Sequence, residues 1–425
     1  MENLSLIGQQ MSQLTGVRAI MKDIIATLRS GEDASWIDLS AGNPVILPEV
    51  EQLWREQAQK TLDSPEFGPI IARYGSSQGY EPMIEAVVSF FNQRYGLSLG
   101  PQNVLITPGS QSIYFFAANS FAGPMPGGGR KKVLLPLSPD YTGYGGVALT
   151  PDLVWAVKPF IEKTSAHRFK YRPDFSQLVF DESIGCIIFS RPCNPTGNVL
   201  TDDEVQKIAD LAAVYDIPVL VDSAYAPPFP ALNYVPMEPN FSANVLHCLS
   251  LSKAGLPGER LGIVIGDAKY IDLLQSFQTN ACVHSSRFGQ AIAAPTISSG
   301  ALAEIAQNVI SPHYGEKFKL ITEAFFRYCP DAIPWYLHET EGGIFAWLWL
   351  ENLPITDVEL YQLLKQSGVI VVPGSSFFPG LREEWKHKHE CIRISLTATP
   401  QELEEGVRRI ADVISKVYQE QVEAS

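Results

Sequence analysis

The chain has 425 residues, of which 45% are hydrophobic and 18% are charged. This composition is typical of a globular protein with a large core, and it excludes a disordered chain or a fibrous repeat. The 32 Lys and Arg residues stand against 46 Asp and Glu residues, which gives a net charge of −14. We therefore expect no nucleic acid and no anionic membrane as partners, because both bind extended basic surfaces.

The first 31 residues mix polar and apolar side chains without an apolar core, which argues against a secretory signal or a membrane anchor. No later stretch approaches the roughly 18 consecutive apolar residues of a membrane-spanning helix. The six cysteines are far apart in the sequence and include no C-x-x-C pair, which favours reduced, mostly buried thiols. We expect a cytoplasmic protein.

Short apolar runs rich in β-branched residues recur through the middle of the chain. Continuous hydrophobicity predicts strands that are covered on both faces. Between two of these runs, Thr201 and Glu204 form a capping box that opens a segment of helical periodicity. This strand–helix–strand order predicts an α/β domain with a largely parallel sheet, whose ligands bind at the carboxyl ends of the strands. The runs are residues 133–137, 186–190, 218–222, 245–250 and 262–265.

After about residue 310 the pattern changes to a mixture that predicts a smaller α+β domain. A helical segment is followed by three apolar runs and by a final helix with one apolar face. These elements are expected around Tyr314–Tyr328, at residues 343–350, 368–372 and 391–395, and from about Gln401.

Three polar residues lie at or just beyond the ends of predicted strands. Lys253 would be the amine that reacts with an aldehyde, because partial desolvation supplies the neutral form of a lysine. Asp222 would pair with a ring nitrogen and keep it protonated, and Asn194 together with Tyr225 would hydrogen-bond the 3-oxygen of the ring. A lysine, an acid and an amide in this arrangement are the parts needed to hold pyridoxal phosphate.

The phosphate of that cofactor needs backbone N–H donors at a helix start, together with hydroxyl groups and a cation. Residues 107–112 open an apolar segment and offer the helix start. The predicted phosphate ligands are Gly109, Ser110, Gln111, Ser250, Ser252 and Arg260.

An ordered set of motifs resembles the fold-type I pyridoxal-phosphate-dependent aminotransferases of the aspartate aminotransferase superfamily. The motifs span nearly the whole chain, and their order is far more specific than any one of them. Three segments, residues 190–199, 249–258 and 372–380, more narrowly resemble the valine–pyruvate aminotransferase group. The matching motifs are Ser40–Pro44, Tyr74–Gly79, Gly109–Gln111, Asn194–Gly197, Asp222–Tyr225, Ser250–Lys253, Arg260 and Arg393.

The resemblance implies further roles. Arg393 matches the arginine that clamps the substrate α-carboxylate, with help from Gly42 and Asn194. Tyr141 matches the aromatic residue that stacks on the cofactor ring. Tyr74 matches a residue that reaches the phosphate in the neighbouring subunit, which implies a homodimer with shared active sites.

The resemblance also implies an architecture and a reaction. We expect a large domain (residues 51–310) with a mostly parallel seven-stranded sheet sandwiched by helices. A small α+β domain (residues 311–425) is expected to pack with an N-terminal segment (residues 1–50). The expected reaction transfers an amino group between a small apolar amino acid, valine or alanine, and a 2-oxo acid, pyruvate or 2-oxoisovalerate. Many relatives have eight steps between the lysine and the phosphate-binding arginine. Seven steps separate Lys253 from Arg260 here, so a slightly altered loop is expected.

Alternatives remain at this stage. Another amino-acid specificity, a pyridoxal-phosphate-dependent lyase, or a non-catalytic cofactor-binding domain of a regulator would use nearly the same residues. A metal site is not expected, because His387 and His389 lie on a charged segment without nearby ligand partners, which is typical of a solvated face. Neither a dinucleotide-binding G-x-G-x-x-G motif nor a hydrolase G-x-S-x-G elbow follows the predicted strands.

Overall fold

The computed structural model describes residues 3–12, 17–29 and 36–424. Residues 1–2, 13–16 and 30–35, which belong to the predicted N-terminal segment, and residue 425 lie outside the described residues. The α-helices are α1 (Leu6–Ser12), α2 (Val17–Arg29), α3 (Pro48–Leu62), α4 (Phe67–Ala72), α5 (Glu81–Tyr95), α6 (Ser110–Phe121), α7 (Asp202–Ala213), α8 (Ala268–Cys282), α9 (Arg287–Ser298), α10 (Ala301–Ile305), α11 (Ser311–Tyr328), α12 (Asp357–Gln366) and α13 (Pro400–Ala424).

The strands form two large sheets and one short pair. They are β1 (Ile37–Asp38), β2 (Val104–Pro108), β3 (Gly123–Pro124), β4 (Arg130–Leu135), β5 (Val154–Ala156), β6 (Phe160–Ser165), β7 (Arg168–Arg172), β8 (Ile184–Ser190), β9 (Val219–Asp222), β10 (Val245–Ser250), β11 (Leu261–Ile265), β12 (Trp335–His338), β13 (Phe345–Leu350), β14 (Val369–Ile370), β15 (Val372–Pro373) and β16 (Cys391–Ser395).

The first large sheet has the strand order β2-β11-β10-β9-β8-β4-β3, and β5 also pairs with β4. β4, β8, β9 and β10 run parallel to one another, whereas β11 runs antiparallel to both of its neighbours. The family resemblance implied seven strands; the sheet has eight, because the two-residue strand β3 forms a hairpin with β4. The predicted parallel core of the sheet is confirmed.

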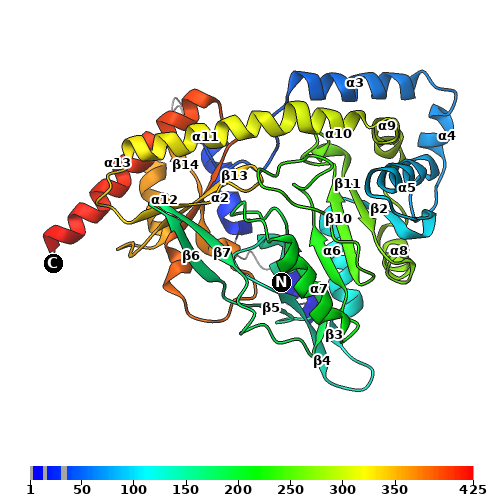
Figure 1. Cartoon of the computed structure of the whole chain (residues 1–425), viewed down its shortest axis with the longest axis horizontal. Helices are drawn as coiled ribbons and strands as arrows, with labels where there is room; N and C mark the ends of the chain where they lie inside the picture. Colours follow the sequence, from blue (N-terminus) through cyan, green and yellow to red (C-terminus); the bar gives the residue numbers. More distant parts are fainter. Residues whose placement is uncertain (1–2, 13–16, 30–35, 425) are drawn as a thin grey trace.

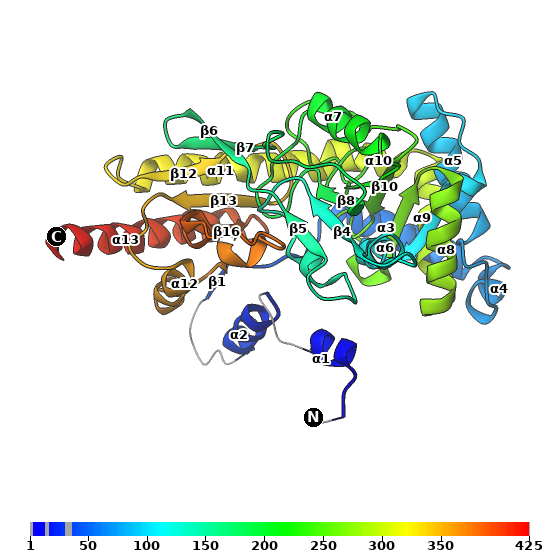
Figure 2. The ribbon, with the colours of Figure 1, turned by 90° about the horizontal axis from the view of Figure 1, so that it is seen from below.

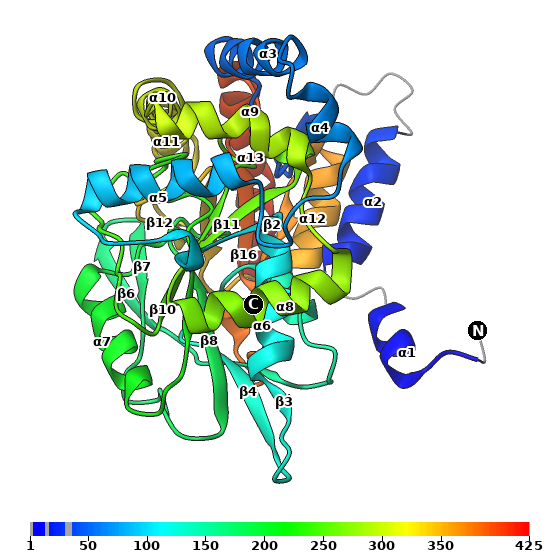
Figure 3. The same cartoon turned by 90° about the vertical axis from the view of Figure 1, so that its right-hand side faces the viewer.

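Helices cover this sheet on its two faces, as Figure 3 shows with α5, α6, α7 and α8 around it. The predicted capping box opens α7: the Glu204 N–H donates to the Thr201 hydroxyl at 3.1 Å, and the Thr201 N–H donates to the Glu204 carboxylate at 2.8 Å. The strands β8, β9, β10 and β11 are buried along their whole length. Burial on both faces explains their continuous apolar sequences.

The second large sheet has the order β15-β16-β13-β12-β7-β6. Its strands β12, β13, β15 and β16 come from the carboxyl-terminal part of the chain, as expected. Strands β6 and β7 come from residues 160–172, and β7 pairs in parallel with β12. Figure 1 shows α12 and α13 beside this sheet at one end of the molecule, with α11 running from there toward the large sheet.

The N-terminal segment contacts the carboxyl-terminal part of the chain. β1 pairs in parallel with β14, and the Asp23 carboxylate of α2 accepts hydrogen bonds from Tyr361 at 2.8 Å and Lys365 at 2.9 Å. Figure 2 shows α1 and α2 on one side of the main body. These contacts support the expected packing of residues 1–50, and the domain boundaries at residues 50 and 310 stay a prediction. None of the helices in the described ranges is long and apolar enough to cross a membrane.

Candidate active site

The carboxyl ends of β8, β9 and β10 meet at a cavity of about 190 Å³ beside the start of α6. Parallel strands present their carboxyl ends at one edge of a sheet, so residues far apart in the sequence converge there. Ten predicted site residues line this cavity: Ser110, Gln111, Tyr141, Asn194, Asp222, Tyr225, Ser250, Ser252, Lys253 and Arg260.

Lys253 follows β10 and points its amine across the cavity. The amine donates a 2.5 Å hydrogen bond to the Gly42 carbonyl oxygen and lies 5.8 Å from the centre of the Tyr225 ring. Burial, assisted by the positive charges of Arg393 and Arg260, lowers the pKa of Lys253 to about 8. A substantial fraction of this amine is therefore neutral near pH 8, which suits a nucleophile or a proton carrier.

Asp222 ends β9 and is buried. Its carboxylate accepts a 2.8 Å hydrogen bond from the Tyr144 hydroxyl and a 3.0 Å hydrogen bond from the Ala224 N–H. Burial raises the pKa of Asp222, while the hydrogen bonds from its neighbours and the charge of Lys253 oppose the rise. The buried carboxylate can pair with a cationic nitrogen in the cavity.

Gly109 and Arg260 form a cradle at the start of α6. Gly109 precedes the helix with a φ of +86°, and a Cβ placed there would lie 2.3 Å from Arg260 Nη2. Arg260 has a φ of +52° and donates a 3.4 Å hydrogen bond to the Ser252 hydroxyl. The short turn Pro257–Glu259 and the left-handed Arg260 thus return the guanidinium to the helix start, despite the seven-step spacing. A helix N-terminus beside a guanidinium favours a phosphate group.

Arg393 lies on β16, close enough to Lys253 for its charge to lower the pKa of that amine. Its guanidinium donates to the Asn194 side-chain oxygen at 3.1 Å and to the Ser40 carbonyl oxygen at 3.0 Å. The rings of Phe345 and Phe377 lie 4.0 Å and 4.8 Å from the guanidinium carbon. Burial lowers the pKa of Arg393 to about 10, so the group keeps its charge at neutral pH. Its Nε is buried without a hydrogen-bond partner among the described residues, which leaves a donor for a ligand carboxylate.

Two predicted aromatic residues have different surroundings. Tyr141 lines the cavity, and its ring packs edge-on against Tyr144 at 5.3 Å between ring centres. Tyr74 is 87% exposed and packs against the His284 ring at 5.9 Å. The structure therefore places Tyr74 outside the cavity of its own chain, which is compatible with a role toward a second chain.

Several residues of the site were missed by the sequence interpretation. Tyr144 and Tyr114 surround Asp222, and Asp140 with Ser190 lies beneath Asn194. Tyr114 is fully buried, and its ring packs edge-on against Tyr144 at 5.2 Å between ring centres. The only sequence feature that could have indicated Asp140 and Tyr144 as site residues is their closeness to Tyr141 in the chain.

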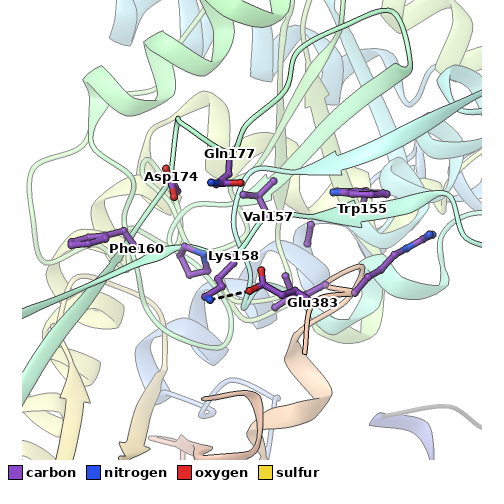
Figure 4. Close-up of a pocket in the computed structure, with 11 residues that line it drawn as sticks. Trp155, Val157, Lys158, Phe160, Asp174, Gln177 and Glu383 are labelled. Atoms are coloured by element: carbon purple, nitrogen blue, oxygen red, sulfur yellow. Dashed lines mark hydrogen bonds and ion pairs between the residues drawn. The ribbon is translucent and has the colours of Figure 1, made fainter. Parts of the chain in front are cut away.

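A larger cavity of about 510 Å³ lies between β5, β6 and residues 381–383, and Figure 4 shows its lining. Lys158 and Glu383 point toward one another there and form a 3.0 Å ion pair. This cavity contains none of the predicted site residues. It therefore lies apart from the residues of the proposed site.

The expected solvated face at His387 and His389 is wrong for His387. This side chain is buried, stacks on Trp385 with ring centres 4.5 Å apart and hydrogen-bonds the Tyr171 hydroxyl. Burial lowers the pKa of His387 to about 3, so it is a neutral core residue. No cluster of metal-binding side chains occurs within the part of the chain that the structure describes.

The donor set around the small cavity fits pyridoxal phosphate. A partly neutral amine, a buried carboxylate and an anion cradle without a Cβ stand at the distances given above, and the buried Oε1 of Gln111 has no partner among the described residues. These are the groups that an aldehyde, a pyridine nitrogen and a phosphate require.

Comparisons with known proteins agree with this site. Residues 34–410 match the family "Aminotransferase class I and II". The chain is 36% identical over 416 residues to the valine–pyruvate aminotransferase of Escherichia coli K12, which covers 98% of this chain and 99% of that protein. It superimposes on a crystal structure of an aminotransferase-family protein from Psychrobacter arcticum 273-4 with a TM-score of 0.93, 35% identity and coverage of 99% and 100%.

A second solved structure, the valine–pyruvate aminotransferase of Salmonella typhimurium LT2, gives a TM-score of 0.85 at 35% identity. The match covers 94% of this chain and all of that one. The cavity that fits pyridoxal phosphate agrees with the family match and with the near-complete coverage of these relatives. The chain therefore belongs to the class I and II aminotransferases, which are pyridoxal-phosphate-dependent transaminases of fold type I.

Proposed function

We propose that this transaminase moves an amino group between a small apolar amino acid, valine or alanine, and a 2-oxo acid, pyruvate or 2-oxoisovalerate. The observation that carries the proposal is the 36% identity to a valine–pyruvate aminotransferase over nearly the full length of both chains. The cavity supports it: apart from Lys253 and Arg260, the described residues that line it carry no positive charge. With Arg393 holding the α-carboxylate, a side-chain carboxylate of the substrate would therefore meet no further cation than those two among the residues that line the cavity.

The proposed roles follow from the geometry. Lys253 attaches the cofactor and then carries the α-proton of the substrate, because its lowered pKa leaves part of the amine neutral. Asp222 holds a protonated ring nitrogen. Arg393 clamps the α-carboxylate with its free Nε and with the donors that now contact Asn194 and Ser40. When bound, pyridoxal phosphate supplies the electron sink that acidifies the α-carbon.

The remaining ligands complete the proposed site. Tyr141 would cover one face of the ring, Asn194 and Tyr225 would hydrogen-bond its 3-oxygen, and Gly42 would help to hold the α-carboxylate. Arg260 and the start of α6 would hold the phosphate. The predicted phosphate ligands there are Gly109, Ser110, Gln111, Ser250 and Ser252.

We also propose that the active unit is a homodimer with shared sites and that the enzyme is cytoplasmic. Tyr74 supports the dimer, because its side chain is 87% exposed although a phenol ring is usually largely buried. Apolar side chains of Ile46, Ile71 and Val283 are exposed as well. A second copy of the chain would cover such groups.

A half-reaction assay tests the substrate proposal. Valine added to the purified holoenzyme should abolish the visible absorbance of the bound cofactor and release 2-oxoisovalerate, and pyruvate should restore the absorbance and yield alanine. Lys253→Ala should abolish both changes, whereas replacement of the exposed Lys269 by Ala should not. Absence of a response to valine and alanine, with a response to other amino acids, would indicate another specificity. Release of ammonia would favour a lyase.

A further inference from the structure

Asp140 is a buried carboxyl group of the active-site region to which the proposed reaction assigns no role. Its side chain is 1% exposed. The carboxylate accepts hydrogen bonds from the Tyr141 N–H at 2.6 Å, from the Ser190 N–H at 3.2 Å and from the Ser190 hydroxyl. It forms no ion pair with any cation in the described ranges. Burial of a carboxylate without a cation costs folding free energy unless hydrogen bonds replace the lost water.

The hydroxyl of Ser190 connects Asp140 to the proposed substrate clamp. The single proton of this hydroxyl is donated to Asp140, so a lone pair accepts the Asn194 N–H at 3.3 Å. The Asn194 side-chain oxygen in turn accepts the Arg393 guanidinium at 3.1 Å. Hydrogen bonds of Ser190 and of the main chain and side chain of Asn194 therefore connect the carboxylate of Asp140 to Arg393.

A second route from Asp140 reaches the same guanidinium through the backbone. The Asp140 N–H donates to the Phe377 carbonyl oxygen at 2.9 Å, and the Phe377 ring lies 4.8 Å from the Arg393 guanidinium carbon. The side chain of Asp140 thus contacts Ser190, which precedes the loop of Asn194. Its main chain contacts Phe377, whose ring packs on Arg393. Asp140 also directly precedes Tyr141 in the sequence.

We propose that Asp140 is a positioning residue that holds Asn194, Arg393 and Tyr141 in the arrangement that binds the substrate carboxylate beside the cofactor ring. The proposal deepens the proposed function, because it rests on Arg393 as the carboxylate clamp. A carboxylate suits this task, since both of its oxygens accept hydrogen bonds. An amide at this position would turn an NH₂ donor toward the N–H of Tyr141 or toward the donors of Ser190.

The charged and titratable groups that face Asp140 are Asp222, Tyr144 and Cys193, none of which is a cation at neutral pH. Burial raises the pKa of Asp140 to about 7, while the hydrogen bonds from Ser190 and Tyr141 oppose the rise. The ionised form accepts all of the observed hydrogen bonds. The hydrogen bonds from Ser190 and Tyr141 therefore favour the ionised form of Asp140.

The test compares Asp140→Asn, Ser190→Ala and the double variant with the unmodified holoenzyme. Asp181→Asn is a matched control, because the Asp181 carboxylate likewise accepts the N–H of Ser183 at 2.8 Å and its hydroxyl at 2.5 Å, far from the cavity. The first measurement is the Kd of 3-methylbutanoate, a carboxylate of the valine skeleton without the amino group, by calorimetry. The second is the separate effect of each variant on KM and kcat for the best amino donor.

Asp140→Asn and Ser190→Ala should each raise the Kd and the KM about tenfold, the loss expected for one well-placed hydrogen bond in a charged network, with a smaller change in kcat. The Kd and KM of the double variant should be close to those of the single variants, because both substitutions act through the same hydrogen bonds. Asp181→Asn should bind like the unmodified enzyme. Ser190→Ala deletes only a hydroxyl group, so it tests the same hydrogen bonds if Asp140→Asn fails to fold.

A Kd within twofold of the unmodified value in Asp140→Asn and Ser190→Ala would overturn the proposal, as would additive effects in the double variant. Failure of the unmodified holoenzyme to bind 3-methylbutanoate or, where the best amino donor is another amino acid, the carboxylate of that donor's skeleton would overturn it as well, since the clamp itself would then be wrong. Failure of the valine–pyruvate assignment is distinguishable. It would leave the ratios of Kd between variants intact and would be detected in the half-reaction assay of the unmodified enzyme.

Discussion

The hydroxyl of Tyr144 donates a 2.8 Å hydrogen bond to the carboxylate of Asp222, and both side chains are buried. The two residues are 78 positions apart in the sequence. This hydrogen bond lowers the pKa of Asp222 against the opposing effect of burial. Tyr144 therefore helps to keep charged the group that is proposed to hold the ring nitrogen of the cofactor.

Replacement of Tyr144 by Phe should lower kcat/KM by about ten- to a hundredfold, because a buried hydrogen bond to a charged group contributes about 1.5–3 kcal/mol. The pKa of Asp222 should rise, which reduces the fraction of the enzyme with a protonated ring nitrogen. Steady-state kinetics and the dissociation constant of the cofactor measure these effects. Tyr234→Phe is the control, since the buried Tyr234 hydroxyl has no hydrogen-bond partner among the described residues and Tyr234 does not line the cavity. Equal losses in the two variants would contradict the assignment.

The lowered pKa of Lys253 predicts a pH-dependent reactivity of the cofactor-free enzyme. The neutral amine becomes the major form as the pH rises through about 8. Competitive labelling with acetic anhydride, followed by mass spectrometry, should show the labelling rate of Lys253 rising up to this pH and levelling above it. Lys269, which is exposed and has a raised pKa, should show no such plateau in the same range. A midpoint for Lys253 near the ordinary lysine value of about 10.4 would refute the burial argument.

Gly109→Ala should weaken cofactor binding at least about tenfold, because the new methyl group would lie 2.3 Å from Arg260 Nη2 and displace a phosphate ligand. Gly128→Ala is a matched control, since Gly128 has the same φ of +86° and a Cβ there would meet nothing within 4 Å. Both variants should lose about 1–2 kcal/mol of stability to backbone strain. Titration with the cofactor, followed by fluorescence, should show weaker binding by Gly109→Ala than by Gly128→Ala. Equal affinities would show that Gly109 is not at the phosphate.

The sequence predicted the elements whose signals are local. The strand at residues 245–250 and the capping box at Thr201 lie where the patterns placed them. The convergence of Asn194, Asp222 and Lys253 could be predicted as well, because each follows a buried parallel strand. Arg393 could be assigned only through the family motifs, since its own segment resembles any buried strand.

Other features depend on contacts between distant segments, which local patterns do not record. Residues 160–172 join the second sheet through the pairing of β7 with β12, about 170 residues away. His387 looked solvent-exposed because its neighbours in the sequence are charged, yet Trp385 and Tyr171 bury it. Asp140 likewise acquires its contacts only when β8 brings Ser190 beside it.

Tyr74 and Lys253 allow a test of the shared active site. If Tyr74 serves the cofactor of a second chain, Tyr74→Ala and Lys253→Ala should each reduce activity strongly as homodimers. In a hybrid dimer, one site would combine both substitutions, whereas the other would combine an intact Tyr74 with an intact Lys253. Random exchange of subunits should therefore restore up to about a quarter of the unmodified activity.

The measurement mixes the two purified variants under conditions that allow subunit exchange and follows activity over time, with the size of the assembly checked by sedimentation. A mixture of Lys253→Ala with Arg260→Ala is the control, because both residues line the cavity of one chain. In that hybrid each site would contain one substitution, so activity should stay low. Full independence of the Tyr74→Ala and Lys253→Ala chains, with no gain on mixing, would show that Tyr74 acts within its own chain or not at all. Its 87% exposure in the single chain makes a function inside that chain physically difficult, since an exposed ring has few groups to contact.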